Sequence, residues 1–139
     1  VSDNENISNT SKPNRISVLP FKQIQNLDDL SRELNQRDNK MIMLDFYADW
    51  CVSCKEYEKL TFSHPKIKEQ LADYSLLQID VTKNNDGHKA LLKHFNLYGP
   101  PAILFFDRQH NELRTFRIVG YKNVSQMLDH LKTLQHENQ

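Results

Sequence analysis

The sequence predicts an α/β fold, in which helices flank a sheet with parallel central strands and an antiparallel hairpin at one side. Short apolar runs of strand length alternate along the chain with segments of helical spacing. The last two predicted strands follow each other directly, with only the turn 108–112 between them. The length of 139 residues suits one domain with a sizeable core.

The first predicted elements are a short strand, a capped helix and a buried strand. The segment 16–24 contains the short strand, which Pro20 restricts to an edge or a break. Asn26 is placed to cap a helix over residues 27–36, where leucines recur on one face. The near-continuous apolar run 40–48 is typical of a central strand that is covered on both faces.

The middle of the chain repeats the helix–strand alternation. A helix is expected from Cys51, and a second buried strand over residues 75–81. The segment 86–97 has the apolar spacing of a helix, with Asp86 as a plausible cap.

The end of the chain predicts a hairpin and a final helix. The strand 101–107 leads into the turn 108–112, and its hairpin partner is expected over residues 113–120. Asn123 is placed to cap the last helix. The apolar stripe of that helix, which we interpret as core, consists of Val124, Met127, Leu128, Leu131 and Leu134.

Composition argues against two classes of partner. The 18 basic and 18 acidic residues balance, so no charge excess favours nucleic acid. No apolar run approaches the roughly 18 residues of a membrane-spanning helix. Residues 1–19 are polar and predict a flexible linker, and residues 20–139 predict the folded domain.

The chain has two cysteines, Cys51 and Cys54, in a C-x-x-C pattern where a predicted strand runs into a helix. Free backbone N–H groups and the helix dipole favour a thiolate at Cys51. Cys54 lies one turn further on the same face, where it is less open to solvent. This arrangement predicts that Cys51 attacks a partner disulfide and that Cys54 resolves the mixed disulfide.

Two other interpretations of the pair are weaker. A structural disulfide across this short loop would constrain the unfolded chain little. A zinc site usually needs four ligands in two closely spaced pairs, and the histidines offer no tight second pair. We therefore expect no metal and no cofactor other than the Cys51–Cys54 disulfide. The histidines are His64, His88, His94, His110, His130 and His136.

The residues around the pair resemble a known family. "LDFYADWCVSCK" resembles the active-site segment of thioredoxin-like proteins, and "GPPAILFF" resembles their cis-proline segment. The longer string "YADWCVSCKEYEKLTF", with "LLQIDVT" and "ALLKHFNLYGPP" downstream, is similar to the C-terminal domain of the DsbD family of transmembrane reductases. This resemblance covers roughly residues 20–134.

The resemblance implies a thioredoxin fold, with a central mixed β-sheet, and a protein-disulfide reductase. It implies a periplasmic domain of a bacterial inner-membrane protein. Electrons would pass from a membrane-embedded domain to the N-terminal domain of the same parent protein through transient mixed disulfides. They would then reach disulfide isomerases and cytochrome c maturation proteins. The isolated domain is expected to be a monomer.

The resemblance also gives roles to two acids. Asp45, inside the apolar run, matches the buried acid of thioredoxin-like proteins, and Glu58 matches an acid of the DsbD domain. Carboxylates near the sulfurs oppose thiolate formation, so we expect a comparatively reducing pair. Asp45 can also accept the proton of Cys54. Titration of the thiolate absorbance in Asp45→Asn and Glu58→Gln tests this hypothesis, which requires that at least one substitution favours the thiolate.

The partner-binding surface is expected beside the cysteines. Pro101 aligns with the cis-proline of the family, and a cis X-Pro bond is a rare feature. Pro100 before it has no N–H, so only its carbonyl can pair with a partner strand. We therefore expect partner binding to depend on contacts around Trp50, Val52 and Tyr98.

Three alternatives remain open at this point. A free-standing thioredoxin-like reductase would share the chemistry but lack the membrane-embedded parent. A binding module would use the same groove without redox turnover, although the presence of both cysteines argues against it. A metal-binding module would be revealed by metal analysis of the reduced protein.

Overall fold

The computed structural model describes residues 19–138. Residues 1–18 of the predicted linker 1–19 therefore lie outside the described residues. Leu19, which the prediction assigned to that linker, is buried and packs in the core of the domain. No helix within the described part of the chain has both the length and the apolar character needed to cross a membrane.

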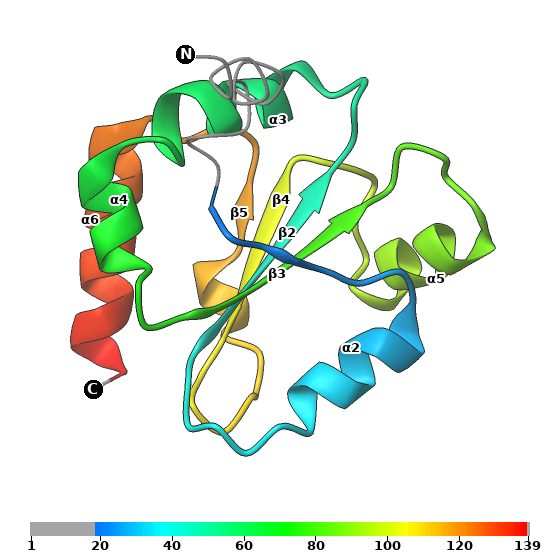
Figure 1. Ribbon diagram of the computed structural model, residues 1–139, viewed down its shortest axis with the longest axis horizontal. Helices are drawn as coiled ribbons and strands as arrows, with labels where there is room; N and C mark the ends of the chain where they lie inside the picture. The colour runs from blue at the N-terminus through cyan, green and yellow to red at the C-terminus, as the bar shows by residue number, and fades with distance from the viewer. Residues whose placement is uncertain (1–18, 139) are drawn as a thin grey trace, which may run out of the picture.

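A five-stranded mixed sheet lies at the centre of the protein, as the sequence predicts (Figure 1). Its strands follow the spatial order β1-β3-β2-β4-β5. Strand β3 is parallel to both β1 and β2, whereas β4 is antiparallel to β2 and β5. The bounds are β1 Lys22–Gln23, β2 Ile42–Tyr47, β3 Ser75–Asp80, β4 Ala102–Phe106 and β5 Ile118–Val119.

Strand β2 occupies the middle of the sheet, and all six of its residues are buried. This confirms the interpretation of the run 40–48 as a central strand that is covered on both faces. The carboxyl end of β2 at Tyr47 leads directly into the turn before Cys51. A strand that is buried along its whole length thus carries the segment with the two cysteines.

Helices cover both faces of the sheet (Figure 1). α2 (Leu27–Leu34) and α5 (Asp86–His94) contribute to one apolar cluster, which also contains both cysteines. α4 (Pro65–Gln70) and α6 (Val124–Glu137) contribute to a second cluster on the other face. The sheet therefore separates two cores, and the cysteines belong to the first.

Asparagines cap three of the helices. Asn26 and Asn123 accept hydrogen bonds from the backbone at the starts of α2 and α6, which confirms both predicted caps. The predicted cap of α5 is wrong: Asn85 accepts the hydrogen bond from the His88 N–H, and Asp86 is the first helical residue. Asp86 instead places a negative charge in the first turn, where the helix dipole favours it.

The segment after Cys51 is less regular than one helix. α3 (Val52–Glu56) continues into the π-helical turn η2 (Tyr57–Thr61), and α4 then begins separately at Pro65. Proline suits the first turn of a helix, because its missing N–H would have no helical partner there.

The predicted hairpin partner 113–120 is mostly not a strand. A 3₁₀ turn, η3 (Arg114–Phe116), interrupts it, and only Ile118–Val119 pairs with β4. The Arg117 guanidinium binds the Glu112 carboxylate through two hydrogen bonds of 2.5 and 2.8 Å. This bidentate pair lies only five residues apart in the chain and favours the compact turn over an extended strand.

Candidate active site

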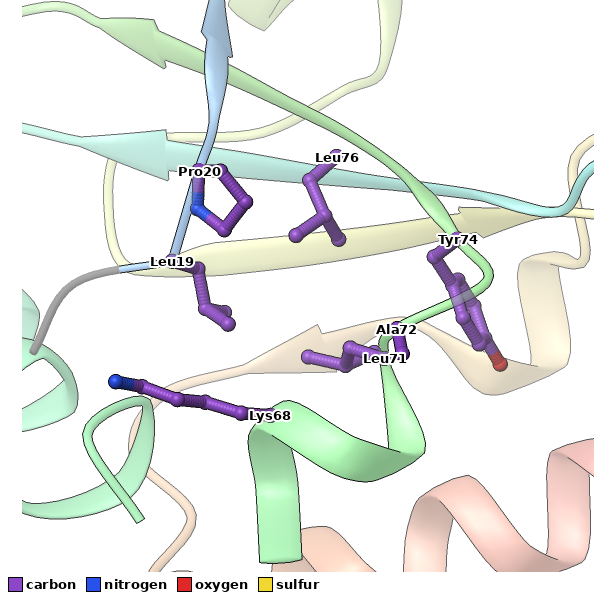
Figure 2. A pocket seen from close by; sticks show the side chains of 7 residues that line it. All are labelled: Leu19, Pro20, Lys68, Leu71, Ala72, Tyr74 and Leu76. Atoms are coloured by element: carbon purple, nitrogen blue, oxygen red, sulfur yellow. The ribbon is translucent and has the colours of Figure 1, made fainter. Parts of the chain in front are cut away.

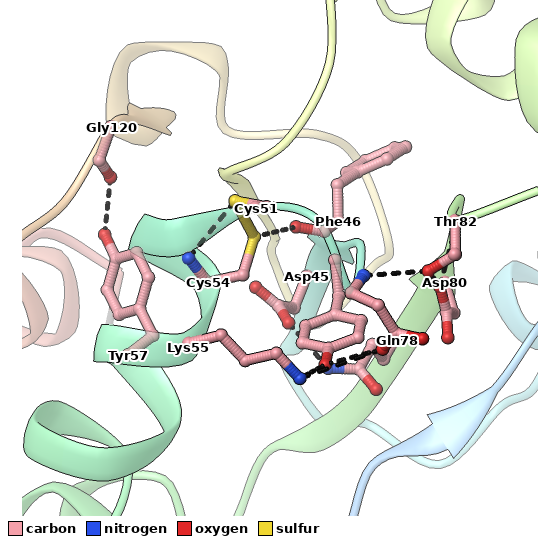
Figure 3. The surroundings of a disulfide bond; sticks show 12 residues. Asp45, Phe46, Cys51, Cys54, Lys55, Tyr57, Gln78, Asp80, Thr82 and Gly120 are labelled. Carbon is pink, nitrogen blue, oxygen red and sulfur yellow. Dashed lines mark hydrogen bonds and ion pairs between the residues drawn. A yellow bond between two sulfur atoms is a disulfide. The ribbon is translucent and has the colours of Figure 1, made fainter. Parts of the chain in front are cut away.

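Cys51 and Cys54 form a disulfide at the start of α3 (Figure 3). Cys51 is the residue before the first helical turn, and its Sγ accepts a hydrogen bond from the Cys54 N–H at 3.1 Å. The Cys54 Sγ lies 3.8 Å from the Phe46 carbonyl oxygen of β2. The pair therefore spans the junction between the central strand and the helix.

The two sulfurs differ little in exposure. Cys51 exposes 6% of its surface and Cys54 exposes 3%. The order agrees with the predicted roles of attacking and resolving residue, but Cys51 is more covered than its predicted role suggests. A partner disulfide must therefore reach a cysteine that is almost completely covered in the oxidised form.

Asp45 is a buried acid on β2, six residues before Cys51. Its carboxylate accepts a hydrogen bond from the Gln78 side-chain amide at 2.8 Å (Figure 3). Loss of solvent raises the pKa of Asp45 from 3.8 to about 7, the Gln78 hydrogen bond opposes this shift, and the charge of Glu58 adds to it. Asp45 can therefore take up or release a proton near neutral pH.

Glu58 lies near enough to Asp45 for its charge to act on that carboxyl group. The prediction that Glu58 shares a helical face with the cysteines was only partly right. That prediction assumed one continuous α-helix, whereas Glu58 belongs to the π-helical turn η2. Its half-buried side chain nevertheless acts electrostatically on Asp45, Tyr47 and Lys55. The structure thus groups the two predicted acids on the α3 side of the sheet.

Lys55 belongs to a polar cluster with Tyr47 and Asp49. Its Nζ lies 2.5 Å from the Tyr47 hydroxyl oxygen and 3.8 Å from the Asp49 carboxylate. The Tyr47 hydroxyl donates to the same carboxylate at 3.0 Å. The hydrogen bond to Tyr47 raises the pKa of Lys55, and nearby negative charges add to this effect. Sequence reasoning missed this cluster because its members are spread over β2, the following turn and α3.

Trp50 is exposed, with 59% of its surface open to solvent. Its indole N–H donates to the Thr82 carbonyl oxygen at 3.1 Å. The backbone N–H of Asp49 donates to the Thr82 hydroxyl oxygen at 2.8 Å. Thr82 was not among the site residues predicted from the sequence. The available signal was the expected parallel pairing of 40–48 with 75–81, which brings the loops after both strands to one edge.

The cis-proline segment lies at the same end of the sheet as the disulfide. The Pro100–Pro101 peptide bond is cis, as the family resemblance implies. Ala102, the next residue, pairs with Phe46 near the end of β2. The Pro101 carbonyl accepts from the Gly120 N–H at 3.2 Å, so the segment after β5 adjoins it.

The exposed large apolar side chains include several of the predicted contact residues. Val52 is 74% exposed and Tyr98 is fully exposed. Val119 on the edge strand β5 is 74% exposed and was not among the predicted residues. Single exposed apolar side chains occur on most proteins, whereas a contiguous apolar patch is typical of a surface that binds other proteins.

A separate pocket of about 300 Å³ lies between the start of β1 and α4 (Figure 2). None of the residues that line it is a cysteine or a candidate acid, so we assign it no part in the site. They are Leu19, Pro20, Lys68, Leu71, Ala72, Tyr74 and Leu76.

Within residues 19–138, no group of three or more His, Cys, Asp or Glu side chains is arranged to hold a metal ion. The redox-capable group in the described part of the chain is the disulfide itself. The arrangement can exchange a disulfide for two thiols, with a buried carboxyl group available nearby for proton transfer.

Comparisons with known proteins agree with this geometry. The thioredoxin-like family model matches residues 24–108. The thiol:disulfide interchange protein DsbD of Haemophilus influenzae is 46% identical over 119 residues, which are 86% of this chain and 21% of the relative. DsbD of Yersinia enterocolitica is 49% identical over 124 residues, or 89% of this chain and 22% of the relative. The chain thus spans about a fifth of the length of these curated relatives.

Solved structures agree as well. The oxidised C-terminal domain of Neisseria meningitidis DsbD matches with a TM-score of 0.66 and 27% identity, over 85% of this chain and all of that chain. A Thermus thermophilus thioredoxin matches with a TM-score of 0.68 over 86% of this chain and 91% of that chain. Its identity of 17% supports the shared fold alone.

Proposed function

This chain belongs to the thioredoxin-like family, and from that premise we propose that it is a protein-disulfide reductase domain that works by dithiol–disulfide exchange. The observation that carries the proposal is the Cys51–Cys54 disulfide at the start of α3, at the carboxyl end of the central strand. In this position the helix N-terminus stabilises negative charge on sulfur. The 46–49% identity to thiol:disulfide interchange proteins supports the same chemistry.

The proposed reaction has two steps. In the reduced form, the Cys51 thiolate attacks a partner disulfide, forms a mixed disulfide and releases one partner thiolate. The Cys54 thiolate then attacks Cys51 Sγ, which releases the second partner thiolate and restores the Cys51–Cys54 disulfide. The partner gains two electrons, and an upstream dithiol must return two electrons to this domain by the same chemistry.

Asp45 is the proposed proton acceptor for the Cys54 thiol. Its pKa of about 7 lets it exist in both protonation states near neutral pH, as a proton carrier must. As carboxylates, Asp45 and Glu58 would also oppose charge on the sulfurs, which favours a reducing pair. In a reducing carrier the dithiol gives up its electrons readily, because the thiolate is not strongly stabilised.

The partner-binding surface is proposed to include Trp50, Val52 and Tyr98, with Pro100 and Pro101 beside them. Trp50, Val52 and Tyr98 are exposed, so a bound partner can cover their side chains. Aromatic residues are enriched in protein–protein interfaces, which supports this assignment. The cis-proline segment lies at the same end of the sheet as the disulfide, so one partner can touch both.

We further propose a route for the electrons. The named relatives are several times longer than this chain, which suits a domain of a larger parent protein. In that arrangement the domain receives electrons from a membrane-embedded domain and passes them to the N-terminal domain of the same parent. The domain would face the bacterial periplasm.

Replacement of the resolving cysteine tests the exchange chemistry. Cys54→Ala should trap a mixed disulfide on Cys51, because no second thiol can release the partner. The measurement is a non-reducing gel followed by mass spectrometry of the trapped species, with the parent protein expressed at full length. Cys51→Ala is the matched control and should trap nothing at this position.

Two outcomes would contradict the proposal. The exchange chemistry fails if Cys54→Ala traps no partner while the wild-type disulfide resists mild reductant. The route fails, with the chemistry intact, if the trapped partner is not a domain of the parent protein.

A further inference from the structure

Thr82, which follows β3 in the chain, bonds to both central residues of the turn that leads from β2 to Cys51. The Cys51 N–H donates to the Ala48 carbonyl at 3.1 Å and closes a turn whose central residues are Asp49 and Trp50. Both central residues are bonded to Thr82, which lies more than 30 positions later in the chain. The Asp49 backbone N–H donates to the Thr82 hydroxyl, and the Trp50 indole donates to the Thr82 carbonyl.

Thr82 is itself held in one orientation (Figure 3). Its backbone N–H donates to the Asp80 carboxylate at 2.9 Å, and its hydroxyl donates to the same oxygen. A hydroxyl has a single proton, so once that proton points at Asp80, a lone pair is left to accept from Asp49. The orientation of the Thr82 hydroxyl is thus determined by its two partners.

We propose that Thr82 is a positioning residue for the disulfide-exchange site, oriented by Asp80 and acting on Cys51 through the turn 48–51. The inference rests on the exchange function proposed above. Thr82 does not act on sulfur itself. It holds Asp49 and Trp50, the two residues directly before Cys51. In this way it determines the direction from which an incoming disulfide can meet Cys51 Sγ.

Physical reasoning connects this bracing to the rate of exchange. Thiolate attack on a disulfide depends on access to sulfur, and a small misplacement of reacting groups is costly. Cys51 is only 6% exposed, so a small shift of its turn changes its access substantially. The turn is also exposed at Asp49 and Trp50, and bonds to Thr82 replace the packing that a buried turn would have.

The test compares Thr82→Val with Thr82→Ser. Valine keeps the shape of threonine but removes the hydroxyl, so the Asp49 N–H loses its acceptor. The Asp80 carboxylate loses the hydroxyl donor and keeps the Thr82 backbone N–H. Serine keeps the hydroxyl and is the matched control. The reduced proteins are mixed with oxidised glutathione, and formation of the Cys51–Cys54 disulfide is followed over time.

We expect Thr82→Val to lower the second-order rate constant about tenfold, in line with the cost of misplacing a reacting group. Thr82→Ser should stay within about twofold of wild type on the same reasoning. Trp50 is the single tryptophan of the chain, so its fluorescence reports on the turn alone. Acrylamide should quench Trp50 more strongly in Thr82→Val than in wild type or Thr82→Ser.

A second variant guards against misfolding. Asp80→Ala removes the group that orients the Thr82 hydroxyl but leaves Thr82 unchanged, and it should shift rate and quenching in the same directions. The inference is overturned if Thr82→Val exchanges at the wild-type rate, or if Thr82→Ser slows as much as Thr82→Val. If the wild-type chain does not exchange at all, the proposed function fails. The quenching comparison then still decides whether Thr82 holds the turn.

Discussion

The carboxyl group of Asp45 has lost nearly all contact with solvent and keeps one side-chain hydrogen-bond donor, the Gln78 amide. A single neutral hydrogen bond does not compensate for the lost hydration of a carboxylate, so burial dominates and raises the pKa of Asp45 to about 7. The buried carboxyl group of Asp45, beside the disulfide, therefore lowers the stability of the folded protein at neutral pH. Such costs are common where a group takes part in proton transfer.

Asp45→Asn tests that cost through the pH dependence of stability. In the unfolded chain Asp45 ionises near its ordinary pKa of 3.8, and in the folded protein near 7, so the folded state holds the extra proton between these values. The free energy of unfolding therefore falls as pH rises from about 4 to about 7, by on the order of 4 kcal/mol. Asparagine cannot ionise, so the free energy of unfolding of Asp45→Asn should rise relative to that of wild type across this range. The difference should be constant above it.

The measurement is urea unfolding of the oxidised protein between pH 4 and pH 8, read as the difference between Asp45→Asn and wild type. Asp73→Asn removes one carboxylate at an exposed position and controls for the change in net charge. A difference that stays flat with pH would show that burial does not perturb Asp45.

At the scale of elements, the π-helical turn η2 connects the cysteine helix to the segment after β5. The buried Tyr57 hydroxyl donates to the Gly120 carbonyl at 2.7 Å and accepts from the Lys122 N–H at 3.0 Å. The Thr61 hydroxyl donates to the Lys122 carbonyl at 2.9 Å. Because the Gly120 N–H also bonds to the Pro101 carbonyl, one segment joins the cysteine helix to the cis-proline segment.

Tyr57→Phe should destabilise the protein by about 1–3 kcal/mol, because the Gly120 carbonyl and the Lys122 N–H both lose their partner at a partly buried position. The aromatic ring is kept, so it still stacks on Phe62, with 5.0 Å between the two ring centroids. Urea unfolding of the oxidised form measures this change in the free energy of unfolding. Tyr98→Phe makes the same chemical change on a fully exposed side chain and should cost nothing measurable. Equal stabilities for the two variants would show that the Tyr57 hydroxyl does not hold the elements together.

At the scale of the whole molecule, the sequence predicts what local pattern determines and misses what tertiary contacts determine. The central strand and the C-x-x-C position follow from a short apolar run and its neighbours, and the structure agrees. The choice of Asn85 over Asp86 as cap depends on the path of the loop, since both residue types suit that position. Thr82 gives no local signal of this role, because the two residues that it holds, Asp49 and Trp50, lie more than 30 positions earlier in the chain.

The division of the molecule into two cores predicts that stability and exchange chemistry can be separated. Leu91 of α5 lies in the core that contains the cysteines, and Leu131 of α6 lies in the core on the other face of the sheet, with both side chains fully buried. Leu91→Ala and Leu131→Ala should each lower the free energy of unfolding by about 2–5 kcal/mol, through lost burial and the cavity left behind. Leu131→Ala should nevertheless exchange with oxidised glutathione at the wild-type rate under conditions where circular dichroism shows it folded. The cavity would open in the apolar cluster that does not contain the cysteines, and a close-packed interior relaxes little around a lost side chain. A folded Leu131→Ala protein with clearly slower exchange would mean that the second core also shapes the cysteine pair.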